Sequence, residues 1–437
     1  MKNITKFFTD LGIEETTVLA VLAAVAFFGL IFGAPDLGRA GVSWAILFLP
    51  AWLPLVLLYW LSKLWVFYVR QQYIAGQDTI LLEIKIPRDI DKSPRAMEAV
   101  FSGLHIGPGE GTFVDRLIKG QVRPWWSFEL VSLEGRIHFY VWTRAFFKEY
   151  VETQIYAQYP EVEIFEVEDY IRQVPYNPEK HSLWGCDFKL GGKDAYPIKT
   201  YVDYQLDKDP KEEYKIDPIA HLFEYLSSLK KGEYAFIQVM IRTNKDKRKK
   251  PGTWFEKEDR WKAEAKEEVD KIYKEATPTL KDKDGKESPG LPSLRTAQKE
   301  KVEAIDRSLD KQGFDTGIRG IYMAEKDSFK GIRIAGLTGV FKQFSSSHLN
   351  SIVPTGWFTT FSFEWQSWFG AKAQAAAGIF DAYAQRSWFH PPYDTPAYVM
   401  TTEELATIYH FPSRTVQAPG LERLPSTKAE APPNLPI

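Results

Sequence analysis

The side chains best suited to metal binding or acid–base chemistry are thinly spread along the sequence. No two of the seven histidines stand in an H-x-x-x-H or H-E-x-x-H pattern, the spacing that places two ligands on one helix face. Cys186 lies five residues after His181, but no second pair completes a metal site. We therefore expect core or surface roles for the histidines, which are His105, His138, His181, His221, His348, His390 and His410.

A glycine-rich segment, GPGEGT at 107–112, is the one candidate phosphate loop. It lacks the Gly-Lys-Ser/Thr ending of a P-loop and lies between a predicted helix and a predicted strand. A P-loop joins a strand to a helix, because the helix N-terminus has to face the phosphate. No Walker motif, no Gly-x-Ser-x-Gly elbow and no carboxylate isolated in an apolar stretch is evident elsewhere. The sequence therefore predicts no catalytic residue, no metal and no cofactor, and a protein that is not an enzyme.

One compact basic run, KDKRKK, offers a contact for anionic groups. Such a run can bind the phosphates of nucleic acid or of acidic lipid headgroups. A solubilising start to a charged segment is the alternative, and it is favoured because three acidic residues follow between 256 and 259. The candidate contact residues are Lys245, Lys247, Arg248, Lys249 and Lys250.

Two uncharged apolar runs organise the N-terminal region. The second, 41–62, exceeds the roughly 20 residues that a helix needs to cross a bilayer core of about 30 Å, and the first, 18–34, is at the lower limit. Only six residues separate them, so we expect a two-helix transmembrane hairpin over 17–70, after a cytoplasmic N-terminus of 1–16. A signal peptide followed by one anchor is the alternative, but acidic residues precede the first run where a signal peptide has a basic start.

The distribution of basic residues predicts the orientation of the hairpin. Lys2 and Lys6 precede it, Lys63 and Arg70 follow it, and the short link holds only Arg39. Because cytoplasmic flanks carry the excess of Lys and Arg, both ends are expected in the cytoplasm. The sequence thus predicts a cell (inner) membrane protein whose bulk is cytoplasmic.

The segment 71–170 shows the order strand, helix, strand, strand, helix, strand, which is that of a ferredoxin-like unit. Alternating apolar residues mark the strands, and apolar residues three or four apart mark the helices. The expected strands are 79–87, 126–133, 136–142 and 162–167, and the expected helices begin at 94 and 147.

A second pattern of the same kind is predicted over 196–410, after a connector at 171–195. Between its second and third strands lies a charged insertion, 244–313, expected to project as an antiparallel helical arm that is either solvated or a partner contact. A single larger α+β domain is the alternative. The expected elements are strands 198–206, 234–242, 318–325 and 398–400, arm helices 254–276 and 294–312, helices from 218 and over 329–344, and a capping box at Thr401 and Glu404 before a proline-rich tail, 411–437.

Composition agrees with this α+β class. Charged residues make up 26% of the 437 residues, and the net charge of −2 provides no overall basic field for nucleic acid. A single cysteine excludes a disulfide within the chain, as is usual in a reducing compartment. We expect a two-helix transmembrane hairpin followed by two tandem ferredoxin-like units, the second with a long helical insertion.

Several segments resemble one known family. FELVSLEGRIHFYVWTR and QIYAQYPEVEIFEVEDY, within 126–170, are similar to the amino-terminal, non-motor region of conjugation-type ATPases of type IV secretion systems, above all to divergent membrane-anchored forms. Three further segments share the resemblance: FDTGIRGIYMAEKDSF, FKQFSSSHLNSIVP and MTTEELATIYHFPSRTV.

The resemblance implies a non-catalytic role. In that family a proline-bearing segment leads into a RecA-like motor with Walker motifs, whereas this sequence reaches Ile437 without one. What is implied is a membrane-anchored scaffold or docking component of a type IV secretion-like or conjugative DNA-transfer machine, with a separate RecA-like ATPase as partner and self-assembly into a homo-oligomer. No catalytic residue of the family maps onto this sequence. The alternatives are a subunit that completes an ATPase in trans and a membrane-tethered nucleic-acid-binding protein that uses the basic run at 245–250.

Overall fold

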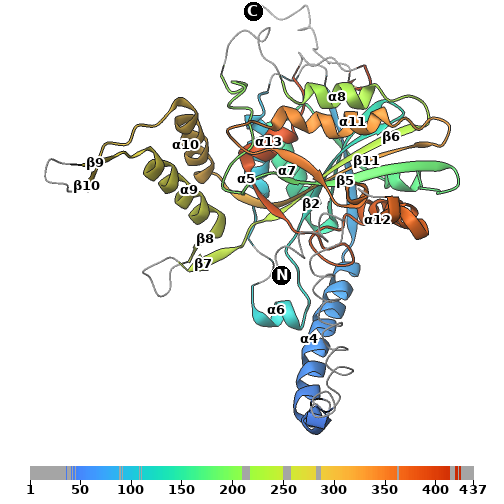
Figure 1. The fold of residues 1–437 in the computed structure, drawn as a ribbon. Helices are drawn as coiled ribbons and strands as arrows, with labels where there is room; N and C mark the ends of the chain where they lie inside the picture. Colours follow the sequence, from blue (N-terminus) through green and yellow to red (C-terminus); the bar gives the residue numbers. More distant parts are fainter. Residues whose placement is uncertain are drawn as a thin grey trace, which may run out of the picture. The chain divides into compact units, whose positions relative to one another are not determined.

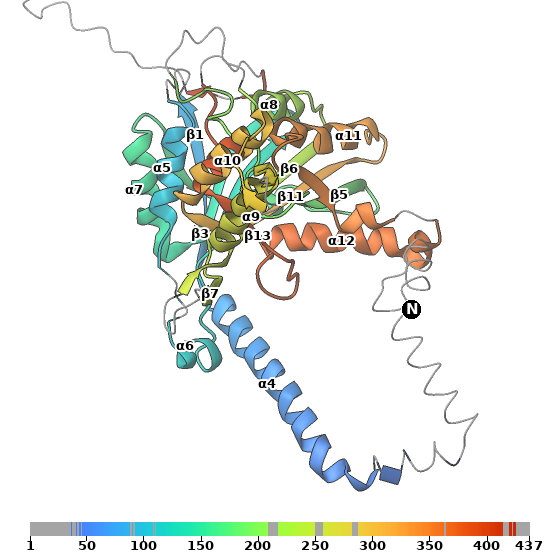
Figure 2. The ribbon, with the colours of Figure 1, turned by 60° about the vertical axis from the view of Figure 1, so that its left-hand side comes forward.

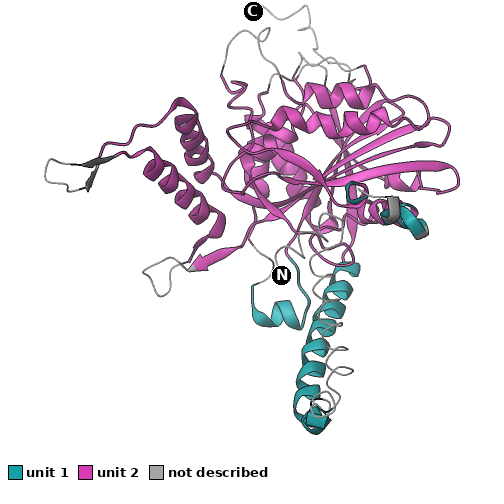
Figure 3. Ribbon diagram, viewed as in Figure 1, with its two compact units in different colours: residues 1–76, 110–122, 359–372 teal, residues 77–109, 123–358, 373–437 magenta. Residues whose placement is uncertain are grey.

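The computed structural model describes residues 36, 41, 43–44, 46–87, 90, 92–107, 109, 111–208, 217–249, 257–281, 287–361, 364–413, 419–421 and 423–424 (Figure 1). The chain divides into two compact units (Figure 3). Unit 1 comprises 1–76, 110–122 and 359–372, and unit 2 comprises 77–109, 123–358 and 373–437. The first predicted apolar run, 18–34, and most of the predicted proline-rich tail lie outside the described residues.

Unit 1 is built on one long apolar helix, α4 (Leu49–Ala75). A proline in the first helical turn, Pro50, suits its start, because proline lacks the N–H that such a position leaves unbonded. Almost none of its side chains is buried, and by length and composition α4 is long and apolar enough to cross a membrane. Residues 49–62 of the second predicted run therefore lie in α4, which continues past Ser62 into a more polar end. Unit 1 also contains the short helix α6 (Phe113–Leu117).

Unit 2 contains a mostly antiparallel sheet of ten strands. In its first half the strand order is β4-β1-β3-β2, with β1 between β3 and β4. The β2–β3 turn is tight because Glu134 and Gly135 both adopt positive φ, 55° and 89°, as a type I′ turn requires. The predicted elements of this half are confirmed: β1 (Thr79–Pro87), α5 (Arg95–Leu104), β2 (Trp126–Leu133), β3 (Arg136–Arg144), α7 (Lys148–Gln158) and β4 (Glu163–Val167).

The second half has the strand order β12-β5-β11-β6, and β6 pairs with β2 to join the halves into one sheet. Two short strands from the C-terminal region complete it, β13 (Tyr398–Thr401) beside β11 and β14 (Arg423–Leu424) in parallel with β1. The other elements are β5 (His181–Leu190), α8 (Ala220–Ser227), β6 (Glu233–Thr243), β11 (Gly313–Glu325), α11 (Ile332–Gly339) with the 3-10 turn Val340–Phe344, and β12 (Ile352–Thr355).

The predicted strand at 198–206 is wrong, because this segment forms successive turns. Thr200 donates its backbone N–H to Oδ2 of Asp203 at 2.8 Å, and Leu206 donates its own to the Tyr201 carbonyl. Such local bonds compete with strand pairing. Burial does not alternate either, since Thr200 and Tyr201 are both buried.

The strand that takes its place is β5, which lies in the segment predicted as a connector, 171–195. β5 is buried on both faces through most of its length, so the apolar–polar alternation that marks a half-exposed strand is missing. The last strand of the second pattern was predicted at 398–400. In the structure β12 is that last strand, because it pairs with β5, whereas the predicted segment forms β13 and pairs with β11. Helix α12 (Ala371–Ala384) was not predicted.

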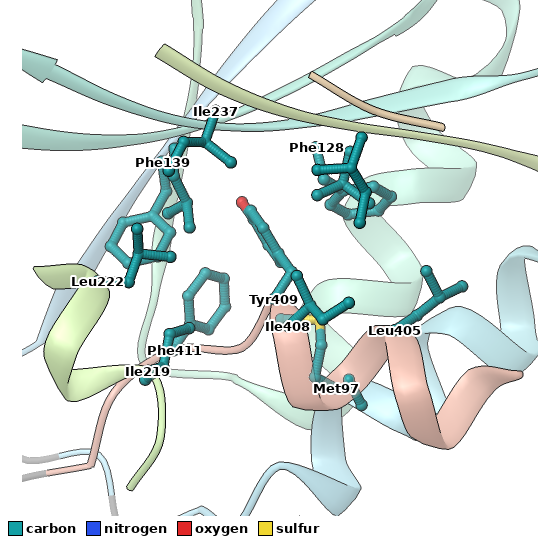
Figure 4. Close-up of a cluster of buried hydrophobic side chains, with 14 of the residues drawn as sticks. Met97, Phe128, Phe139, Ile219, Leu222, Ile237, Leu405, Ile408, Tyr409 and Phe411 are labelled. Atoms are coloured by element: carbon teal, nitrogen blue, oxygen red, sulfur yellow. The ribbon is translucent and has the colours of Figure 1, made fainter. Parts of the chain in front are cut away.

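Two layers cover the sheet of unit 2. Helices α5, α7, α8 and α13 (Thr402–Ile408) pack on one face, where Tyr409 lies among Phe128, Phe139 and Phe411 (Figure 4). Glu129 follows Phe128 in β2 and therefore points to the opposite face. Helix α12 lies on that face of the sheet, away from α8 and α11 (Figure 2), and Arg386, which follows α12, donates to the Glu129 carboxylate.

Candidate functional site: the helical arm and the buried polar row

The insertion between β6 and β11 forms a helical arm that projects from the sheet of unit 2 (Figure 1). Its two main helices are α9 (Arg260–Ala276) and α10 (Thr296–Leu309). The arm begins with the β7–β8 ladder (Lys247–Lys249 and Lys257–Asp259), and its far end carries the β9–β10 ladder (Thr279–Lys281 and Glu287–Pro289). The predicted pair of arm helices is confirmed, although each is shorter than predicted.

The arm has a small core of its own. Ala265 and Ile272 of α9 pack with Val302 and Ile305 of α10 and with Ala195, which precedes the turns at 198–206. The charged insertion that the sequence predicts therefore also has a narrow apolar stripe on each of its helices. This stripe fixes how the two helices pack against each other.

Ion pairs hold the base of the arm. Arg307 of α10 binds Asp203 at 2.8 Å and Glu403 of α13 at 2.9 Å. Lys311 binds Glu98 of α5 at 2.6 Å. Because Glu98 and Glu403 are buried, the ion pairs that these two residues form are shielded from water and bind the arm to the helical layer more firmly than surface pairs would.

The basic run predicted as a phosphate or lipid contact lies at the start of this arm. Arg248 of β7 binds two carboxylates, Glu258 at 3.2 Å and Glu267 at 2.7 Å. Lys247 and Lys249 flank it in the same strand, and Lys245 precedes it, whereas Lys250 lies outside the described residues. The acidic residues that follow the run in sequence thus neutralise its arginine in space, which weighs against a phosphate site centred on Arg248.

One carboxyl group beside the arm base has a strongly altered pKa. Burial raises the pKa of Glu404 from 4.5 to about 7, although Thr401 donates its backbone N–H and its hydroxyl, and Ile198 its N–H, to this side chain. The expected capping box at Thr401 and Glu404 is confirmed. No isolated carboxylate in an apolar stretch of the sequence indicates this pKa, because burial in the fold, not apolar neighbours in the sequence, desolvates Glu404.

This pKa predicts a loss of stability as the pH rises. Between pH 4.5 and about 7 the folded chain keeps a proton on Glu404 that the unfolded chain releases, so the free energy of unfolding falls across this window. The loss attributable to Glu404 is at most about 3 kcal/mol. Denaturant unfolding of the full chain in detergent at pH 5 and pH 8 measures it, and Glu404→Gln, which does not titrate, should flatten the dependence. An unchanged pH dependence in that variant would contradict the assignment.

A row of polar side chains crosses the other face of the sheet. Its members lie directly opposite one another in neighbouring strands: Tyr140, Glu129, Gln238, Arg319 and Asp187. Arg319 donates from Nε to Oδ1 of Asp187 at 2.8 Å, and Trp357 donates from Nε1 to Oδ2 at 2.7 Å. Burial raises the pKa of Asp187 even so.

Arg386, just after α12, binds Glu129 near the centre of this row. Its Nε and Nη2 donate to the two carboxylate oxygens of Glu129 at 3.0 and 3.2 Å, and its Nη1 and Nη2 bind Asp169. The two carboxylates raise the pKa of Arg386 although burial acts to lower it. Arg386 and Glu129 are fully buried, so the row fastens α12 and the following segment to the sheet and leaves this group closed to a substrate.

The histidines and Cys186 were the other candidates for a reactive or metal-binding group in the sequence. No three His, Cys, Asp or Glu side chains come together as a metal site within the described parts of the chain. Cys186 is buried, and burial raises the pKa of its thiol, which suits an unreactive core residue. His138 contacts Glu83 at 2.8 Å, and His410 contacts Asp217 at 3.2 Å, both as isolated pairs.

A family model for a domain of unknown function, DUF8128, matches residues 71–423. The chain belongs to this family. The DUF8128 region begins near the end of α4 and runs to the first residue of β14, so it contains the sheet, its covering helices and the arm. No curated protein matches the chain.

The far end of the arm, still within the DUF8128 region, exposes apolar side chains. Leu291, in the segment that joins β10 to α10, is 89% exposed. Tyr273, near the end of α9, is 39% exposed. Hydrogen bonds from Ser293 to Ala276 and from Gly290 to Pro278 hold the two segments together at this tip. The sequence pattern does not predict this tip, because a single leucine among prolines and serines is typical of a loop.

Proposed function

We propose that this protein is a non-catalytic, membrane-anchored docking component of a type IV secretion-like or conjugative DNA-transfer machine. The observation that carries the proposal is the arm: two helices inserted into a β-hairpin, with a core of their own, a base held by buried ion pairs and an exposed apolar tip. An element that is fixed at its base and apolar at its end suits contact with a partner.

The second element of the proposal is the anchor. In this proposal α4 crosses the inner membrane as one helix of a two-helix hairpin, and unit 2 lies in the cytoplasm. The length and exposed apolar surface of α4 support this placement, as does the predicted excess of basic residues on the two flanks.

We further propose that the sheet of unit 2 derives from two ferredoxin-like halves. Each half has its strands in the order fourth, first, third, second along its own chain, which is the order of that fold. The two halves join through their second strands, β2 and β6. Two ferredoxin-like units in tandem are also what the pattern of strands and helices in the sequence predicts, so the strand order supports this part of the proposal.

The partners that we propose are a separate RecA-like ATPase, docked at the arm, and further copies of this chain. Leu291→Asp places a charge on the arm tip and should reduce the fraction of detergent-extracted chain found in its native complex by at least about tenfold, the effect of losing one strong contact. Blue native electrophoresis of membranes from the native cell measures that fraction.

The matched control is Ile332→Asp, on α11 of the same unit, where the native side chain is 75% exposed. It should leave the complex intact. If Leu291→Asp has no effect while Ile332→Asp dissociates the complex, the contact lies on α11 and the arm is only a solvated insertion.

A further inference from the structure

Unit 1 contains an ordered turn of helix, α6, that the glycine-rich loop leads into. Thr112 caps it, since its hydroxyl accepts the backbone N–H of Asp115 at 3.2 Å while Asp115 accepts the Thr112 N–H at 3.1 Å. Asp115 also binds Lys119 at 3.0 Å. These bonds define a compact segment, 111–120, instead of an open loop.

This segment is fastened to α4. Trp65 of α4 donates from Nε1 to the Leu117 carbonyl at 2.8 Å. Gly120 has φ +64°, and a Cβ there would lie 2.2 Å from the Val69 carbonyl oxygen, so the two backbones are in direct contact. Within unit 1, α6 therefore lies beside α4 at the level of residues 65–69 (Figure 3).

That level is where α4 would leave the apolar part of a bilayer. The uncharged run ends at Ser62, and Lys63 is the first charged residue after it. At 1.5 Å per residue, 65–69 begin about 5 Å past Ser62 and end about 10 Å past it. Trp65 and Tyr68 fall in this stretch, and such aromatic residues favour the membrane–water interface.

At this level the segment presents an apolar surface. Phe113 is 67% exposed, Val114 is 46% exposed and Ile118 is 60% exposed. The exposed apolar surface of α4 continues up to Tyr68, beside the segment. The charges of Arg116, Lys119 and Asp115 sum to one positive charge, so apolar contact and not charge dominates here.

We propose that the segment 111–120 is an interfacial membrane anchor, whose apolar side chains Phe113, Val114 and Ile118 enter the lipid boundary beside α4. The bilayer that α4 spans is also the partner that covers this apolar face of 111–120, so the inference rests on the membrane anchoring proposed above. Together α4 and α6 then hold the chain at two points of the membrane, which limits the rotation of α4 about its own axis.

Site-directed nitroxide labelling tests this anchor. Cys186 is buried, so Cys186→Ala in the full chain gives a background without reactive thiol. Single cysteines are then introduced at Ile118, at Leu57 of α4 and at Ile332 of unit 2, which are 60%, 58% and 75% exposed. The labelled chains are placed in vesicles of phosphatidylcholine with phosphatidylglycerol. Collision with oxygen, which enriches in lipid, is compared with collision with a water-soluble nickel chelate.

The Ile118 label should lie about 5–10 Å below the lipid phosphates, the depth typical of interfacial helices. The Leu57 label should lie deeper, and the Ile332 label should be in water. An Ile118 label as accessible to nickel as the Ile332 label would overturn the interfacial anchor while leaving α4 as a span. Protection from both reagents would also overturn it, since a protein surface would then cover the segment. A Leu57 label in water would instead refute the membrane anchoring itself.

Discussion

Arg386→Met is expected to lower the free energy of unfolding by about 3–5 kcal/mol, because it leaves the carboxylates of Glu129 and Asp169 without their guanidinium partner. Glu129 is fully buried in the middle of β2, so water cannot replace the lost charge. Methionine retains much of the side-chain length, so the lost ion pairs dominate over lost packing. Denaturant unfolding of the full chain in detergent, followed by tryptophan fluorescence, measures the change.

Two further variants separate the ion pair from a general loss of packing. Adding Glu129→Gln to Arg386→Met should recover part of the loss, since the variant then buries one uncompensated charge fewer. Lys148→Met removes an exposed ion pair with Glu166 and should cost less than about 1 kcal/mol. If Arg386→Met costs no more than Lys148→Met, the buried network does not fasten α12 to the sheet.

Trp388→Ala should also cost about 3–5 kcal/mol, since the indole fills the space between its segment and β11. The ring is almost fully buried, and Arg319 of the polar row lies 5.2 Å from its centre. Gly317 of β11 makes room for it, because a Cβ at that position would lie 2.1 Å from the ring. The same unfolding measurement reports the cavity that alanine leaves.

The glycine supplies an independent test of this contact. Gly317→Ala forces the ring to move and should cost about 1–3 kcal/mol. Gly339→Ala, in α11 with open space around the new Cβ, should be neutral or slightly stabilising. Equal effects of the two alanines would show that the indole does not pack against β11 as described.

Much of the first half of unit 2 could be predicted from the sequence. β1 alternates between apolar residues and the charged Glu83 and Lys85, since one face meets the core and the other is more exposed. The strands of the second half were harder to predict from the sequence. β5 is buried on both faces and has no alternation, while the turns at 198–206 have an alternating pattern but bond locally through Thr200 and Asp203. Alternation of apolar and polar residues reflects alternating exposure of the side chains along a strand. It therefore cannot identify a strand that is buried on both faces.

The candidate site was harder to predict, because its parts are distant in sequence. Glu129 and Arg386 are 257 residues apart, and only the paired strands and the position of α12 bring them together. The one signal in the sequence was Glu129 within the apolar strand WSFELVSL, because a carboxylate in a buried strand has to be paired with a partner. The arm as an insertion was predictable from its charge and helical period, whereas its tip at Leu291 depends on the fold.

The buried polar side chains of this protein bind its own helices and strands to one another. The buried row binds α12, and the arm base binds the helical layer. Exposed apolar side chains lie on α4, on α6 and at the arm tip, and also at single positions such as Ile332 of α11. Exposed apolar side chains of this kind are available for contact with partners or lipid.

The most direct test is affinity purification of the full chain from native membranes in mild detergent, with mass spectrometry of the proteins that accompany it. We expect a RecA-like ATPase at near-stoichiometric yield, together with further copies of this chain. Recovery of the chain alone as a monomer would contradict the docking role and the assignment to a secretion or conjugation machine.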